Sequence, residues 1–205
     1  MKATSSLRAI RQATCPRVMA ALLAATLAVL IDPFLRSSDY RALLHVLPDA
    51  GTLMFSGALV LVFLQVVALF YLVLLLPRIL RAAALVLLVF VVVVQFSYWL
   101  TLSRFMTATD LFLVLTVGGD HRGEAVASFF QPLVFLHALP YILVLSALIL
   151  VPPRSDFRKA LALGLLPVLY LLASNYALFL YVPERSFHLN PLTSFLRSTL
   201  HYEFE

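Results

Sequence analysis

The first candidates for chemistry are polar side chains that interrupt long apolar stretches of the chain. They are Gln65, Gln95, His137, Ser146 and Asn175. Amides and hydroxyls inside lipid form hydrogen bonds between neighbouring helices, so we expect Gln65, Gln95 and Asn175 to join helices and His137 to be packed. No Asp, Glu, Lys or Arg lies in the middle of these stretches. Because proton and ion pumps usually need such a group there, ion coupling is disfavoured.

Residues outside the apolar stretches form no catalytic or metal-binding pattern. Four of the five histidines lie there, together with most of the acids: His45, His121, His188 and His201. However, the spacings HExxH and HxH are absent, so no metal site is expected. Motifs of the types GxSxG, Walker A and GxGxxG are also absent. We therefore expect no catalytic residue and no cofactor in this chain, and the sequence leaves open whether it works as part of an enzyme.

The most polar loop contains Gly118 and Gly119, followed by Arg122. A glycine pair beside an arginine can bind a phosphate through backbone N–H groups and the guanidinium. The same residues also suit a solvated turn, and the sequence leaves both interpretations open.

The elements that carry these residues are apolar enough to require a membrane. The chain has 205 residues, of which 62% are hydrophobic and 12% charged, whereas a soluble domain is roughly 45–50% apolar and about 25% charged. A span needs about 20 apolar residues. Five continuous runs predict an all-α, polytopic membrane protein with five transmembrane helices: residues 18–31, 54–76, 80–102, 133–151 and 160–182. The first run is short and is extended by Phe34 and Leu35. Because Asp32-Pro33-Phe34 follows residue 31 instead of a small-x-small cleavage site, we expect an uncleaved anchor.

Basic residues predict the orientation of this protein. With the N-terminus inside, the inner segments hold nine of the 15 basic residues and a single acid, Asp156: Lys2, Arg8, Arg11, Arg17, Arg78, Arg81, Arg154, Arg158 and Lys159. Cytoplasmic loops are enriched in Lys and Arg, so we expect a bacterial cytoplasmic membrane protein with a cytoplasmic N-terminus and an outward-facing C-terminus. The net charge of +5 is then a feature of topology, and no nucleic-acid partner is expected.

Three regions follow from these patterns: a basic cytoplasmic N-terminus (1–17), a five-helix transmembrane domain (18–182) and an outer-face amphipathic helix (183–205). In the last, Asn190 is a natural N-cap and Pro191 a natural first helical residue, and Leu192 begins an apolar stripe expected at the membrane interface. Further interfacial helices are expected at 36–53 and within 103–131, where Thr109 is placed as a helix cap.

This layout resembles the membrane-bound transferases of the alkaline phosphatase/sulfatase superfamily, such as the lipid A phosphoethanolamine transferases and lipoteichoic acid synthases. Their five spans are followed by a juxtamembrane helix and a large outer catalytic domain. Two short motifs match: Glu124-Ala125 in the segment between spans three and four, and Asn190-Pro191-Leu192 after span five. The resemblance implies a zinc ion and a threonine nucleophile in a separate catalytic domain, beginning where this chain ends.

The resemblance also implies a role for the chain, as the anchor and lipid-donor platform of a phosphoethanolamine or phosphoglycerol transferase. The partners would be a phospholipid and a separate outer-face catalytic domain. Arg104 and Arg122 would pair with the phosphate, and Asp110 or Glu124 with an ethanolamine ammonium. The alternative function is a stand-alone, non-enzymatic inner-membrane scaffold or transporter subunit.

Overall fold

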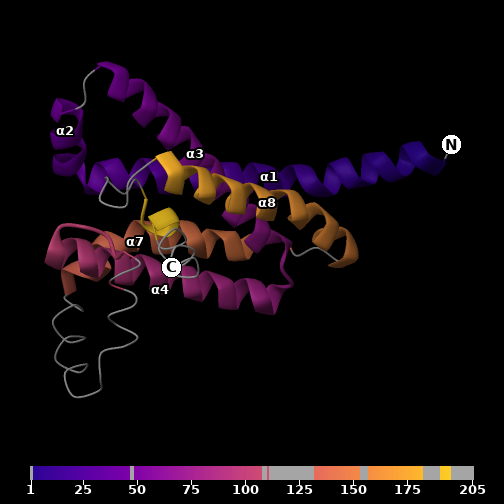
Figure 1. Ribbon diagram of the computed structural model, residues 1–205. Coiled ribbons are helices and arrows are strands. Elements are labelled where there is room, and N and C mark those ends of the chain that lie inside the picture. The colour runs from indigo at the N-terminus through magenta and orange to yellow at the C-terminus, as the bar shows by residue number, and fades with distance from the viewer. Residues whose placement is uncertain are drawn as a thin grey trace.

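The computed structural model describes residues 2–46, 49–107, 110, 132–152, 157–181 and 190–194, and in these the regular structure is helical, with no strand. Figure 1 shows the helices stacked side by side. Their bounds are α1 Lys2–Leu35, α2 Ser37–Val46, α3 Asp49–Leu75, α4 Arg78–Leu102, α7 Pro132–Ala147, the 3-10 turn η2 Leu148–Leu150, and α8 Phe157–Tyr181.

The long helices run back and forth across one bundle (Figure 1). Helix α3 packs between α1 and α8, while α7 packs against both α4 and α1. The bundle therefore has two ends. We call them the α2 end, where α1 and α4 finish, and the α3–α4 end, where Pro77 separates α3 from α4.

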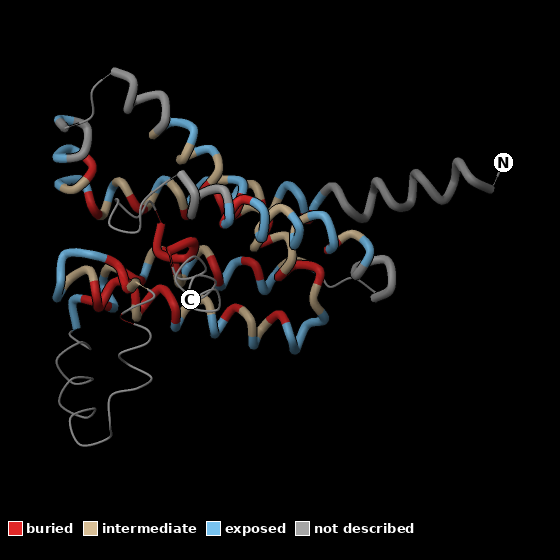
Figure 2. Tube along the Cα trace, viewed as in Figure 1, coloured by how far each residue is buried: buried red, intermediate tan, exposed pale blue. Residues whose placement is uncertain are grey.

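Four helical segments are long and apolar enough to cross a membrane: Pro16–Leu35, Phe55–Leu75, Arg78–Leu102 and Pro132–Leu150. They carry apolar side chains on their outer faces, such as Leu23 and Leu143, and Figure 2 shows exposed residues on the outside of the bundle. The described residues therefore confirm an all-helical architecture with four helices that are candidates to span a membrane. In α8 the described apolar stretch, Ala162–Tyr176, is shorter, so the fifth span stays a prediction.

Small residues on α1 let its neighbours approach closely. Ala21, Ala25 and Ala28 recur at helical spacing on one face of α1 and are fully buried. Close backbone approach through small residues is the usual basis of helix packing in membranes, where lipid removes the hydrophobic driving force. Larger side chains, including Phe70 and Phe96, fill the core beside this face.

Helices α3 and α8 are joined by polar contacts at mid-helix. The amide of Gln65 donates to the Ser174 hydroxyl at 2.9 Å, and the Tyr170 hydroxyl donates to the Leu61 carbonyl at 3.3 Å. The expectation that Gln65 joins two helices is therefore confirmed. Farther along, a side chain on Gly164 would place its Cβ 3.4 Å from Leu72 Cδ2, so the helices are close there as well.

Two other polar residues in the apolar stretches have different partners from those expected. Asn175 was expected to bond another helix, but its amide donates to the Leu171 carbonyl of α8 itself, at 2.8 Å. Gln95 accepts a hydrogen bond from the backbone N–H of Met106 at 2.8 Å, so it secures the chain leaving α4. His137 is packed as expected, with its ring centroid 5.5 Å from that of Trp99.

The first helix is longer than its apolar run, because α1 already begins at Lys2. At its other end α1 continues through Pro33 to Leu35, so it includes Phe34 and Leu35 as expected. Proline lacks an N–H, so Pro33 removes one helical hydrogen bond without ending the helix. The interfacial helix expected at 36–53 is present in part as α2, and its Tyr40 is buried.

The α3–α4 end is held by an arginine that the sequence assigned to a short inner loop. Arg81 is only 1% exposed. Its guanidinium donates to the Leu74 carbonyl at 2.8 Å, to the Leu76 carbonyl at 3.3 Å and to the Val151 carbonyl. Arg17 similarly donates to the Pro152 carbonyl at 3.1 Å. These contacts tie the end of α3 and the end of η2 together, so Arg81 is a structural residue as well as a topological charge.

Candidate polar site at the α2 end

The candidate site begins with three residues spaced four apart along α1 and α2. Asp32, Arg36 and Tyr40 lie at i, i+4 and i+8, a spacing that places side chains on one face of a helix. Backbone hydrogen bonds link them in turn, from Arg36 N–H to the Asp32 carbonyl at 2.9 Å and from Tyr40 N–H to the Arg36 carbonyl at 3.2 Å. Helical geometry therefore persists through the junction of α1 and α2 and aligns the three side chains.

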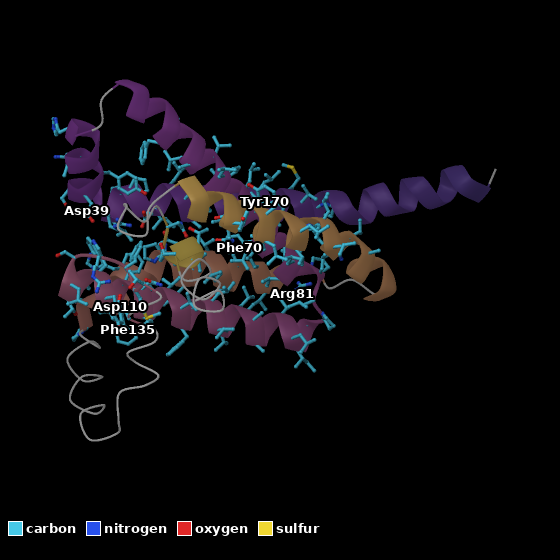
Figure 3. All side chains as sticks on the ribbon, in the orientation of Figure 1. Asp39, Phe70, Arg81, Asp110, Phe135 and Tyr170 are labelled. Atoms are coloured by element: carbon cyan, nitrogen blue, oxygen red, sulfur yellow. The ribbon has the colours of Figure 1, made fainter. Side chains whose placement is uncertain are left out.

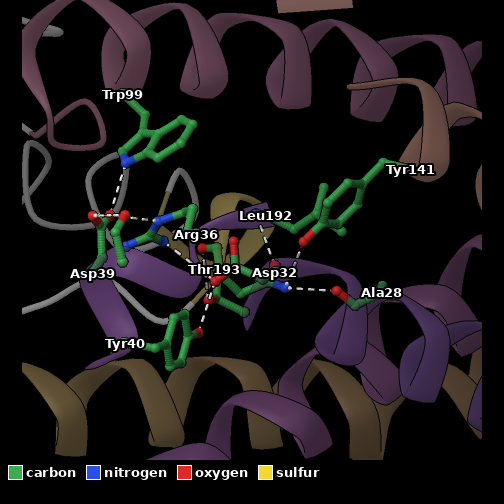
Figure 4. Close-up of polar contacts among 11 residues, drawn as sticks. Ala28, Asp32, Arg36, Asp39, Tyr40, Trp99, Tyr141, Leu192 and Thr193 are labelled. Carbon is green, nitrogen blue, oxygen red and sulfur yellow. Dashed lines mark hydrogen bonds and ion pairs between the residues drawn. The ribbon is translucent and has the colours of Figure 1, made fainter. Parts of the chain in front are cut away.

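These residues, with Asp39 and Trp99, form what we call the Asp32 cluster (Figure 4). Arg36 donates to Asp32 Oδ2 at 3.3 Å and to Asp39 Oδ2 at 3.2 Å. The Tyr40 hydroxyl donates to Asp32 Oδ2 at 2.7 Å, and the Trp99 indole donates to Asp39 Oδ2 at 2.8 Å. The cluster thus connects α1, α2 and α4 through charge-assisted hydrogen bonds, which are stronger than neutral ones.

The Asp32–Arg36 pair of the cluster is buried among aromatic rings, whereas the Asp39 side chain is 30% exposed. Asp32 is 0% exposed and Arg36 is 4% exposed. The Arg36 guanidinium carbon lies 4.3 Å from the centroid of Phe105 and 6.0 Å from that of Trp99. Rings at this range attract a cation. Burial and the neighbouring carboxylate of Asp32 raise the pKa of Tyr40 far above its usual value, so its hydroxyl stays protonated as a donor.

Both described donors to Asp32 use the same oxygen. Arg36 and Tyr40 bond Oδ2, whereas Oδ1 is buried and has no hydrogen-bond partner. An unpaired buried acceptor is costly, and in a membrane protein such a group points to a function. The other side of Asp32 is therefore the part of the cluster that could receive a ligand.

The turn at residues 190–194 covers the cluster from the C-terminal side. Asn190 Oδ1 accepts the Leu192 N–H at 3.0 Å, which confirms Asn190 as an N-cap. Its amide also donates to the Ala28 carbonyl at 3.4 Å and to the Tyr141 hydroxyl at 3.5 Å. Leu192, expected at the membrane interface, is instead 1% exposed within the core, because the cap ties this turn to α1 and α7.

Two of the four predicted binding residues meet each other at the same end. Arg104 forms two hydrogen bonds with the Asp110 carboxylate, one of them at 2.8 Å. The Thr107 N–H and hydroxyl each donate to Asp110 at 2.8 Å. Thr107 Oγ1 also accepts the Asp110 N–H at 3.4 Å, which is the capping contact expected of Thr109, a residue outside the described part of the chain. Arg122 and Glu124 also lie outside it.

Electrostatics stabilise this pair in its charged form. Burial raises the pKa of Asp110, but hydrogen bonds from Arg104 and Thr107 outweigh it, so the pKa of Asp110 lies below its ordinary value. The hydrogen bond with Asp110 likewise raises the pKa of Arg104. The pair is thus ionised at neutral pH, with the Arg104 side chain 47% exposed at its surface.

The spacing of Asp32, Arg36 and Tyr40 predicts the Asp32 cluster, but these residues lie where the first apolar run meets the next polar segment. An acid and an arginine four residues apart are a common helical pair, and Tyr40 extends the spacing by one more turn. The prediction, however, assigned Arg36 to the interfacial segment 36–53 and Asp32 to the first apolar run, so the two residues were not paired. No sequence signal identified Trp99 as a partner of Asp39, since the two are 60 positions apart.

Fold and site together define a membrane-embedded helical bundle with a buried ionic cluster at one end. Among the described residues, no group of three or more His, Cys, Asp or Glu could hold a metal ion. No protein family, curated protein or solved structure matches this chain.

Proposed function

We propose that this chain is a five-span membrane domain that binds a phospholipid head group at its α2 end. The domain would lie in the bacterial cytoplasmic membrane with its N-terminus in the cytoplasm. It would serve as anchor and lipid-donor platform for a sulfatase-like phosphoethanolamine or phosphoglycerol transferase domain on the outer face.

The packing of α8 supports a fifth span. Tyr170 and Ser174 of α8 contact Leu61 and Gln65 of α3, and Gly164 lies against Leu72. The partners on α3 fall in the candidate span Phe55–Leu75. If α3 crosses the membrane, the part of α8 beside it must lie at the same depth.

The distribution of charge supports the orientation. At the α3–α4 end the described charged side chains are arginines, namely Arg17, Arg78 and Arg81. Acids are found at the opposite end, where Figure 3 shows Asp39 and Asp110 far from Arg81. Because basic residues are enriched in cytoplasmic segments, this distribution supports a cytoplasmic α3–α4 end.

The observation that supports a lipid-donor platform is the position of the Asp32 cluster at the depth of lipid head groups. Tryptophan prefers the interface between membrane and water, and Trp99 is near the end of α4 with its indole bonded to Asp39. The Asp32 cluster therefore lies at the level of phospholipid head groups and offers both a guanidinium and carboxylates.

One observation favours the stand-alone scaffold instead. Arg104 and Asp110, both expected to bind a lipid, bond each other in this structure. A scaffold needs such pairs only for its own stability, and it predicts no selective lipid binding.

Topology is tested with single cysteines in a Cys15→Ser background. A membrane-impermeant maleimide should label Ser38→Cys in intact spheroplasts but label Arg78→Cys only after permeabilisation, because both positions are exposed at opposite ends. The reverse pattern would overturn the orientation. Lys159→Cys lies in the first turn of α8 and His188→Cys follows α8 in the sequence, and labelling of both from the same side would overturn the fifth span.

Lipid binding is tested on the purified chain by native mass spectrometry after detergent exchange. The platform predicts at least one retained phospholipid. Complete loss of lipid under conditions that keep the protein folded would refute it.

A further inference from the structure

The α3–α4 end of the bundle gathers positive charge from separate parts of the chain. Arg17 of α1 donates to the Pro152 carbonyl at 3.1 Å, and Arg81 of α4 donates to the carbonyl of Val151, the residue before it. The two guanidinium groups are close enough for their charges to repel each other. Packing of α1, α4 and η2 therefore holds two like charges side by side, an arrangement that a nearby anion would stabilise.

The acids of this end are too few to balance its basic residues. The segments that meet here contain nine Lys and Arg residues and one acid, Asp156, which lies outside the described residues. Even with Asp156 paired to one guanidinium, a large positive excess remains. Described acids such as Asp39 and Asp110 lie at the opposite end (Figure 3). Arg81 itself donates to neutral backbone carbonyls, and its buried Nε has no hydrogen-bond partner among the described residues.

The N-terminus of α4 is the accessible part of this end. Its first residues, Arg78, Ile79 and Leu80, are all exposed. No described side chain caps the helix at Pro77, so the first backbone N–H groups of α4 are available to an anion at the positive end of the helix dipole. Arg78 adds an exposed guanidinium beside these N–H groups, three residues before the buried Arg81. An anion can therefore reach this positive charge from outside the bundle.

These groups lie close to the ends of the candidate membrane spans. On this side of the bundle the spans begin or end at Pro16, Leu75, Arg78 and Leu150. Arg17 and Arg81 are one and three residues inside those limits, which corresponds to about 1.5 and 4.5 Å along a helix. Exposed apolar side chains continue along α4, including Val86 and Phe90. A phosphate at the start of α4 would thus lie at head-group depth, with its acyl chains beside an apolar helix face.

From these observations we infer that the N-terminus of α4 binds the phosphate of an anionic phospholipid in the leaflet at the α3–α4 end. Arg78 and the first N–H groups of α4 donate to the phosphate oxygens, and Arg17 and Arg81 attract the phosphate from inside the bundle. A zwitterionic head group binds less well, because the same arginines repel its cation. This site is separate from the platform proposed at the α2 end and does not depend on it.

The test measures the binding of two lipids to the full chain by native mass spectrometry. Phosphatidic acid is the anionic probe, and phosphatidylcholine, which carries a quaternary ammonium, is the zwitterionic one. We expect the unmodified chain to prefer phosphatidic acid by about tenfold. In Arg78→Gln the affinity for phosphatidic acid should fall about fivefold, which corresponds to about 1 kcal/mol for one basic residue at a membrane surface.

Arg41→Gln is the matched control. Arg41 is exposed on α2 at the opposite end of the bundle, so this variant loses the same charge without changing α4. Its affinity for phosphatidic acid should equal that of the unmodified chain. Both substitutions are at exposed positions and should leave the protein folded. Equal losses of affinity in the two variants would show that only net charge matters and would overturn the site.

Two other outcomes would also overturn the inference. Equal affinity of the unmodified chain for phosphatidic acid and phosphatidylcholine would show that the α3–α4 end does not select an anion. Displacement of bound phosphatidic acid by inorganic phosphate alone would assign the site to a free phosphate instead of a lipid. Both outcomes leave the platform at the α2 end intact, because its own test is the retention of a phospholipid by the purified chain.

Discussion

Replacing Arg81 with methionine should destabilise the bundle, whereas the same change at Arg78 should not. Arg81 is 1% exposed and donates to three backbone carbonyls at the ends of α3 and η2. Arg78 is exposed in the same turn. Methionine keeps most of the apolar stem that arginine packs, so the substitution removes mainly the guanidinium and its hydrogen bonds.

The magnitude follows from the bonds lost. A hydrogen bond to a charged group contributes about 1.5–3 kcal/mol, and the contact of Arg81 with Leu76 at 3.3 Å is weaker than that with Leu74 at 2.8 Å. Two effective bonds, less the cost of burying the guanidinium, leave a net loss of about 2–4 kcal/mol. For a chain of this size, that loss lowers Tm by roughly 5–15 °C.

The assay is thermal unfolding in detergent, followed by fluorescence-detected size-exclusion chromatography. Arg78→Met should stay within about 2 °C of the original protein, because exposed substitutions usually change stability by about 0.5 kcal/mol or less. Equal shifts for the two variants would refute the reasoning, since the two changes differ only in burial and bonding.

Three further outcomes are expected. Because the pKa of Asp110 is lowered in the folded state, its ion pair with Arg104 stabilises the protein above the unfolded pKa of about 3.9, and this stabilisation is lost as the pH falls through the folded value. Asp110→Asn should flatten that part of a stability profile between pH 6 and pH 3, by about 1 kcal/mol or less for so exposed a pair, and an unchanged profile would contradict the assignment. Gly164→Ala should be neutral or raise Tm slightly, since its Cβ would make an ordinary contact at 3.4 Å and alanine favours helix. Gly164→Leu should lower Tm by overpacking against α3, and equal Tm values for the two variants would show that α8 is not close-packed there. Ser174→Ala should lower the free energy of unfolding by about 1–3 kcal/mol, because it leaves the buried Gln65 amide without its partner. Gln65→Leu removes both polar groups of the amide and should lower the free energy of unfolding less. The reverse order in thermal unfolding would contradict the contact.

The sequence predicted the helices well because lipid imposes a simple rule. Backbone N–H and C=O groups in hydrocarbon must form hydrogen bonds within the protein, so long apolar runs form helices. That rule predicted the four described spans, whereas the helix at α2 and the cap at Asn190 were predicted from helical spacing and from capping residues. It could not establish a fifth span, since the described apolar stretch of α8 is short.

The candidate site was harder to predict because its partners are distant in sequence. The Arg104–Asp110 pair is local, and both residues were identified from the polar segment that contains them. The Asp32 cluster depends on α1 continuing through Pro33 and on Trp99 reaching Asp39 from another helix. Local rules disfavour helical geometry at the residue before a proline, and packing of the whole bundle overrides that preference at Asp32.

The cap at Asn190 also has a consequence for biosynthesis. Its amide bonds the Ala28 carbonyl across a separation of 162 residues. At translation rates of about 5–20 residues per second, Ala28 is synthesised on the order of ten seconds before Asn190. The contact of α1 with the turn at 190–194 therefore forms only after the rest of the described bundle has been synthesised.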